Sequence, residues 1–216
     1  MTVDTVICIH GIWSHGTGMY LIKRRLENEY GLRALLFNYA SVRGTLDDNA
    51  ARLSAFILDN KLDSAHLLGH SLGGVIALRM LADDPDAVPG RVVCIGSPLT
   101  GSRAAEFLSR QDWAEPFVGH SLTAGVVHAA ANEWASQVCE ERDVGIIAGT
   151  VPIGFGRLVT RFDGDNDGSV AVSETRLDGA KDHICLPVSH KGMLVSKTVV
   201  DQAAAFLKRG EFLREP

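Results

Sequence analysis

Hydrophobic and polar positions follow two different patterns along the chain. Short apolar runs rich in Val, Ile and Leu are separated by longer segments in which apolar residues recur with the period of a helix. The runs predict strands at 3–10, 32–39, 64–70, 90–97, 143–151 and 183–188, and the helical period predicts helices at 17–29, 47–60, 72–83, 101–110 and 192–208. This alternation is typical of a parallel sheet buried by helices. We expect an α/β fold with a mostly parallel central sheet and helices on both faces.

Residues 111–140 interrupt this alternation. They hold two of the three Trp residues and show no obvious strand, so we expect a small helical, cap-like insertion there. The chain has no internal repeat and no low-complexity tract, and its 216 residues are enough for one hydrophobic core. A single domain spanning 1–216 is predicted.

Composition narrows the class of protein. A formal net charge of −5 argues against a nucleic-acid surface, which needs clustered Lys and Arg. No apolar run has the length of a transmembrane segment, and the first residues lack the basic start of a secretory signal. Three of the four cysteines lie in predicted buried strands, and their wide spacing shows no zinc pattern. We expect reduced thiols in a cytoplasmic protein; the four are Cys8, Cys94, Cys139 and Cys185.

The segment GHSLG, from Gly69 to Gly73, matches the pattern G-x-S-x-G. It follows a predicted strand and opens a predicted helix, so Ser71 is expected on a sharp turn that presents its hydroxyl as a nucleophile. The flanking glycines would leave room for this strained turn. The alternative is a glycine-rich turn with an incidental serine.

GHSLGG, together with IHGIW near the start of the chain, resembles the α/β-hydrolase superfamily and, within it, the small bacterial lipases and esterases. The resemblance extends from the first strand to the last helix. It implies an α/β-hydrolase fold and a serine hydrolase that needs no cofactor. It also implies an oxyanion hole made by the backbone N–H groups of Ile12 and Leu72, with His10 in a structural role.

A serine nucleophile needs a base and a carboxylate that orients the base. In this fold the acid and then the histidine follow the serine along the chain, which leaves His183 and His190. His183 begins the last predicted strand, whereas His190 follows its carboxyl end, where catalytic groups of open α/β sheets gather. His190 is therefore the expected base.

The acid is expected in the loop before the last strand. The segment NDGSV resembles the stretch that carries the catalytic acid in bacterial lipases, which favours Asp167, with Asp163 and Asp165 as alternatives. The same loop, residues 163–174, has the acidic spacing of a calcium-binding EF-hand. Its flanks contain proline and glycine and lead into a strand, so they do not predict the paired helices of that motif.

The favoured function is hydrolysis of carboxylic esters with short to medium acyl chains, by way of an acyl-enzyme. The substrate would be a small-molecule or lipid ester. Two alternatives come from other classes: a calcium-binding or calcium-regulated module that uses 163–174, and an inactive hydrolase-fold interaction domain. The sequence indicates neither the natural substrate nor the oligomeric state.

Overall fold

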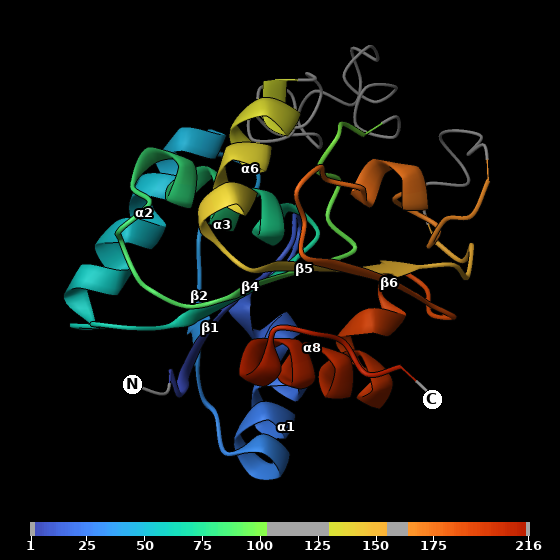
Figure 1. The fold of residues 1–216 in the computed structure, drawn as a ribbon, viewed down its shortest axis with the longest axis horizontal. Helices are drawn as coiled ribbons and strands as arrows, with labels where there is room; N and C mark the ends of the chain where they lie inside the picture. The colour runs from blue at the N-terminus through green and yellow to red at the C-terminus, as the bar shows by residue number, and fades with distance from the viewer. Residues whose placement is uncertain (1–2, 103–129, 155–163, 215–216) are drawn as a thin grey trace.

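The computed structural model describes residues 3–102, 130–154 and 164–214. Its centre is a sheet of six parallel strands in the order β2-β1-β3-β4-β5-β6 (Figure 1). The strands are β1 (Thr5–Ile9), β2 (Arg33–Phe37), β3 (His66–His70), β4 (Val92–Ile95), β5 (Val144–Gly149) and β6 (Asp182–Leu186). All six predicted strands are confirmed, each shorter than predicted, and β6 begins one residue earlier than expected.

Helices cover both faces of this sheet, as predicted. Figure 1 shows α2, α3 and α6 on one side and α1 and α8 on the other. The helices are α1 (Tyr20–Tyr30), α2 (Leu46–Asp59), α3 (Leu72–Asp83), α6 (Ala130–Glu141) and α8 (Lys197–Arg209), with short 3-10 turns η1 (Gly16–Met19), η3 (Val172–Thr175) and η4 (Gly192–Leu194). The helix expected at 101–110 lies outside the described residues from position 103 onward.

The core has two apolar layers, one on each side of the sheet. Along β1, Ile7 and Ile9 pack in the layer under α2 and α3, whereas Val6 and Cys8 pack in the layer that α1 and α8 cover. Successive side chains of a strand point to opposite faces, so a strand covered on both sides must be apolar at every position. This explains why the inner strands read as continuous apolar runs.

The exposure of Cys185 differs from the expectation that the cysteines in predicted strands are buried. Cys8 and Cys94 are buried, as expected of strand cysteines, but Cys185 is exposed. It lies on β6, which is the last strand in the sheet order and is only partly covered. Apolar character alone does not distinguish an edge strand from an inner one. All four cysteines are free thiols.

The region expected to form the insertion is described only from residue 130. There α6 packs against α3, with Ala135 and Val138 in the core. Residues 111–129 lie outside the described part, so the cap stays a prediction. In the described ranges, no helix combines the length and apolar character needed to cross a bilayer. The cytoplasmic location stays a prediction.

The order of the strands indicates where a ligand is expected to bind. The chain passes from β1 to its neighbour β2 on one side, and then returns past β1 to β3 on the other side. In open α/β sheets, ligands bind at the carboxyl ends of the strands where the order reverses in this way. The loop after β1 and the turn after β3 therefore border the expected site, and these segments carry Ile12 and Ser71.

Candidate active site

Ser71 occupies the turn between β3 and α3 in a strained backbone conformation. Its φ is +55° and its ψ is −124°, a backbone conformation that residues other than glycine rarely adopt. Such strain costs about 1–3 kcal/mol and persists only where the surrounding structure imposes it. The Ser71 N–H donates to the carbonyl of Ile95 at the end of β4, over 2.8 Å. The turn is thus anchored to the neighbouring strand.

Gly69 and Gly73 make this turn sterically possible. A Cβ atom at Gly69 would lie 2.3 Å from the backbone nitrogen of Gly74, and one at Gly73 would lie 2.2 Å from the carbonyl oxygen of Ile9. Both obstacles are backbone atoms, which cannot rotate away. Glycine is therefore required at both positions for α3 to start against β1.

Asp167 and His190 are in direct contact. The His190 Nδ1–H donates to Oδ2 of Asp167 over 2.6 Å, and the Asp167 side chain is almost wholly buried. The second carboxylate oxygen, Oδ1, accepts the backbone N–H groups of Ser169 and Val170. A buried carboxylate with both oxygens bonded has one orientation, so the imidazole is also held in one orientation. Asp165, an alternative acid, is exposed.

The end of β4 brings Ser71 close to this pair. Gly96 follows Ile95, the acceptor of the Ser71 amide, and a Cβ at Gly96 would lie 3.1 Å from Asp167 Oδ2 and 3.2 Å from His190 Nδ1. The serine turn therefore contacts Ile95, and the Asp167–His190 pair lies against the next residue, Gly96. In the part of the chain that the structure describes, the Ser71 hydroxyl forms no hydrogen bond to the His190 ring. Catalytic hydrogen bonds of this kind are often long without substrate.

The two amides expected to form the oxyanion hole lie on either side of Ser71. Leu72 is the first residue of α3, where the amides have no partner within the helix. The loop of Ile12 lies against the serine, because a Cβ at Gly11 would be 2.9 Å from the Ser71 Cβ. Within the described ranges, neither amide donates to a protein acceptor. Their role as an oxyanion hole stays a prediction.

His10 orients the Ile12 amide. Its buried ring donates from Nδ1 to the carbonyl of Gly11 over 2.8 Å, and this carbonyl belongs to the same peptide unit as the Ile12 N–H. In a trans peptide the two groups point in opposite directions, so the bond determines where the N–H points. Burial lowers the pKa of His10 from its usual value, while the bond to the Gly11 carbonyl acts in the opposite direction. The structural role expected for His10 fits this contact.

Sequence reasoning missed two side chains at this site. The Tyr39 ring stacks on His10 with centroids 4.3 Å apart, and its hydroxyl donates to the His10 carbonyl over 2.7 Å. His70, inside the GHSLG segment, donates from Nε2 to the carbonyl of His190 over 3.0 Å. The position of His70 beside the serine was a signal that could have been used. Tyr39 has no comparable signal in the sequence.

His183 lies elsewhere. It is near the amino end of β6, and its Nε2–H donates to the hydroxyl of Thr175 over 2.9 Å. The amino end of a parallel strand lies at the opposite edge of the sheet from the turn of Ser71. Of the two histidines left by chain order, the structure brings His190 and not His183 to the expected acid.

The acidic loop uses its side chains for its own hydrogen bonds. Besides the two bonded oxygens of Asp167, Oε2 of Glu174 accepts the Ala171 N–H, and Oδ1 of Asn166 accepts the Gly168 N–H. The loop ends in the 3-10 turn η3 and leads on to strand β6, in place of the exit helix of an EF-hand. Over the described residues, no cluster of three or more His, Cys, Asp or Glu side chains is arranged for a metal. Asp163 lies outside that part.

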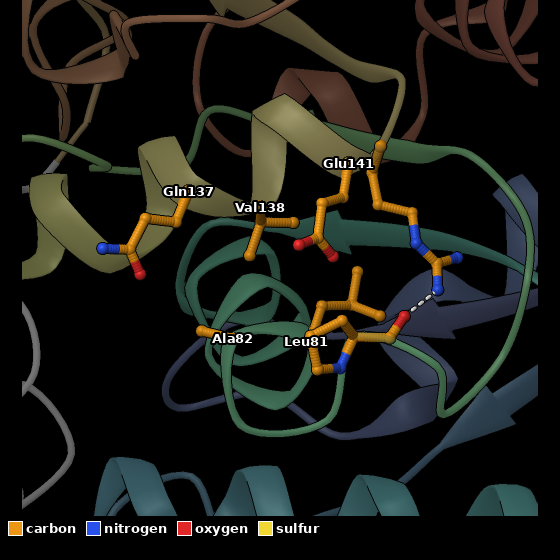
Figure 2. A pocket seen from close by; sticks show the side chains of 7 residues that line it. Leu81, Ala82, Gln137, Val138 and Glu141 are labelled. Carbon is orange, nitrogen blue, oxygen red and sulfur yellow. Dashed lines mark hydrogen bonds between the residues drawn. The ribbon is translucent and has the colours of Figure 1, made fainter.

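A small pocket lies at the end of α3 opposite Ser71. Arg142 lines this pocket and donates to the backbone carbonyls of Pro85 and Val88. These hydrogen bonds hold the loop before β4 in place. The pocket has no nucleophile beside a base, so its contacts are structural. Its lining residues come from the ends of α3 and α6 and from Pro85 and Arg142 just beyond them, and Figure 2 labels Leu81, Ala82, Gln137, Val138 and Glu141.

Comparison with known proteins identifies the family. The model of the alpha/beta hydrolase family matches residues 6–184. The chain belongs to the alpha/beta hydrolase family. No curated protein matches this hydrolase by sequence.

Solved structures share the fold of this hydrolase at low sequence identity. The mature form of the Bacillus licheniformis lipase BlEst2 is 17% identical with a TM-score of 0.77, over 98% of this chain and 93% of the lipase. A metagenomic carboxyl esterase is 18% identical with a TM-score of 0.72, over 88% of this chain and 66% of the esterase. An extracellular alpha/beta-hydrolase from a Paenibacillus species is 14% identical with a TM-score of 0.61, over 95% and 99% of the two chains. At these identities the likeness extends to the fold alone.

Proposed function

We propose that this hydrolase cleaves carboxylic esters with short to medium acyl chains, through an acyl-enzyme formed on Ser71. The observation that carries the proposal is the hydrogen bond between Asp167 and His190 beside a strained serine turn. Membership of the alpha/beta hydrolase family supports hydrolysis in general. The names of the similar structures, a lipase and a carboxyl esterase, support esters as the substrate class.

In the proposed mechanism, Ser71 Oγ attacks the ester carbonyl while Nε2 of His190 takes the hydroxyl proton. The histidine then returns this proton to the leaving alcohol, and the acyl group stays on the serine. Water, activated by the same imidazole, releases the carboxylic acid and regenerates Ser71. The Asp167 carboxylate holds the Nδ1–H, so that Nε2 is the basic nitrogen, and stabilises the imidazolium that forms.

The proposed oxyanion donors are the backbone N–H groups of Ile12 and Leu72. They face the place where negative charge develops on the carbonyl oxygen, and amides held in advance stabilise that charge without reorganising. The position of Leu72 at the start of α3 adds the positive end of the helix dipole. None of these steps uses a cofactor.

The decisive experiment is hydrolysis of a panel of p-nitrophenyl esters by the wild type and by the Ser71→Ala variant, together with labelling by a fluorophosphonate probe. We expect wild-type turnover, labelling at Ser71, and loss of both in the variant. Full activity in Ser71→Ala, or labelling of a different serine, would contradict the proposal. Absence of turnover and of labelling in the wild type would instead favour an inactive interaction domain.

A further inference from the structure

His70 is a buried histidine at the centre of the site that the proposed mechanism does not use. It ends β3, directly precedes Ser71, and is 5% exposed. Its Nε2 lies 3.0 Å from the carbonyl oxygen of His190, which can only accept, so Nε2 carries the proton. The His70 ring is therefore a donor with a defined tautomer.

His190 is held at three points. Its backbone N–H donates to the carbonyl of Asp167 over 2.8 Å, and its ring donates to the Asp167 carboxylate. Its own carbonyl accepts from His70. The first two bonds tie His190 to the acid loop. Among the described residues, the third is the hydrogen bond that joins the loop of His190 to the strand that presents Ser71.

The surroundings of His70 keep its ring in place and neutral. The rings of His70 and His190 are 4.7 Å apart, and a Cβ at Gly11 would lie 3.3 Å from Nδ1 of His70. His70 thus also borders the loop of the proposed oxyanion hole. Burial, and the neighbouring His190, lower the pKa of His70 to about 3. A neutral His70 does not repel the imidazolium that the proposed mechanism forms on His190.

We propose that His70 is a positioning residue that sets the separation between His190 and Ser71 through its hydrogen bond to the His190 carbonyl. The inference rests on the proposed function of the Ser71 site and extends it to a side chain that does not touch the substrate. Proton transfer requires Nε2 of His190 within hydrogen-bond reach of Ser71 Oγ. A shift of about 1 Å at a catalytic group can lower the rate by about 10²-fold.

Two amide variants test the hydrogen bond itself. In His70→Gln the side-chain amide reaches the position of Nε2 and can still donate to the His190 carbonyl. In His70→Asn the amide ends at the position of Nδ1 and cannot reach it. We expect His70→Gln to keep kcat within about threefold of the wild type, and His70→Asn to lose about 10- to 100-fold in kcat, with KM for a p-nitrophenyl ester within about twofold in both.

His66 supplies the matched control. It lies on the same strand and is also buried, but at the other end of β3, where the N–H of Arg91 donates to its Nδ1. His66→Gln and His66→Asn should lower Tm by amounts comparable to the His70 variants and leave kcat unchanged. A loss of kcat that follows Tm across all four variants would overturn the inference, because it would show a structural effect only.

The outcomes separate this inference from the proposed function. If hydrolysis depends on Ser71 but His70→Gln and His70→Asn have equal kcat, whether high or low, the hydrogen bond does not position His190 and the inference alone fails. If Ser71→Ala retains hydrolysis, the proposed function fails and the inference fails with it. A kcat loss in His70→Asn that His70→Gln rescues, at matched Tm and KM, supports both.

Discussion

Asp167 and His190 are joined by two hydrogen bonds, one from ring to carboxylate and one from backbone to backbone. The ring bond is 2.6 Å long, and the His190 N–H reaches the Asp167 carbonyl over 2.8 Å. The backbone bond holds the two residues together independently of their side chains. A substitution that changes only the carboxylate should therefore leave this part of the fold intact.

We expect Asp167→Asn to fold and to lose kcat by on the order of 10³-fold or more. The amide oxygen must face the N–H groups of Ser169 and Val170, which now donate to Oδ1, so the NH₂ group faces His190. An NH₂ group there forces Nδ1 to accept and places the proton on Nε2, the wrong nitrogen for a base. Steady-state kinetics measure the loss. Asp165→Asn, at an exposed position of the same loop, is the control and should retain activity.

The two candidate histidines should behave differently. His190→Ala should lower kcat by on the order of 10³-fold or more, because it removes the proposed base. His183→Ala should keep kcat and lower Tm, because Thr175 loses the donor that His183 supplies within the fold. Kinetics and thermal melts of both variants check this, and the reverse result would move the base to His183.

Chelation should have no effect. The Asp167 carboxylate is committed to His190 and two backbone amides, and Oε2 of Glu174 to the Ala171 amide, so a calcium ion would have to break these bonds. We expect EGTA to change neither ester hydrolysis nor Tm. A drop in Tm with EGTA that added calcium restores would instead support the calcium module.

Acyl-chain length provides a test of the substrate class. The sequence predicts a single modest insertion, at 111–140, with which to shelter an acyl chain. We expect kcat/KM to be highest for p-nitrophenyl esters of short to medium chains and low for long-chain emulsions. Strong activation at an oil–water interface would contradict this preference.

Folding stability should depend on pH through buried histidines. Burial, with the nearby Arg91 charge, lowers the pKa of His66 to about 4, below its ordinary value of 6.5. Between these two values the unfolded state binds a proton that the folded state does not, so the free energy of unfolding falls as pH falls, by up to about 1.4 kcal/mol per pH unit. Above pH 6.5 the His66 side chain is neutral in both the folded and the unfolded state, so it no longer makes the free energy of unfolding depend on pH.

The variant His66→Gln isolates this term because glutamine does not titrate. We expect the difference in Tm between wild type and His66→Gln to shift in favour of the variant as the pH is lowered from 7.5 to 5. Thermal melts at a series of pH values measure it. A difference that is constant across this range would show that His66 titrates normally in the folded protein.

Local sequence patterns were sufficient to predict the six strands and the turn at Ser71. Both follow from local rules: an apolar run of strand length must be buried, and a serine between close-packed glycines after such a run has few conformations open to it. Chain order and the position of strand ends also favoured His190, because in a parallel sheet every carboxyl end lies at one edge, whereas Asp167 was favoured by the resemblance of NDGSV to the acid-bearing stretch of bacterial lipases. The preference for His190 over His183 needed only the direction and order of the elements.

The edge position of a strand and the contacts between polar groups across the site depend on how the whole chain packs. Cys185 is exposed because β6 has a neighbour on one side only, which depends on sheet order and not on the apolar run itself. The contact of His70 with the His190 carbonyl joins residues 120 positions apart, and that of Tyr39 with His10 joins residues 29 apart. Hydrogen bonds are effective only within about 3 Å and at restricted angles, so such pairs are specified by the packed chain and leave no periodic signal in the sequence.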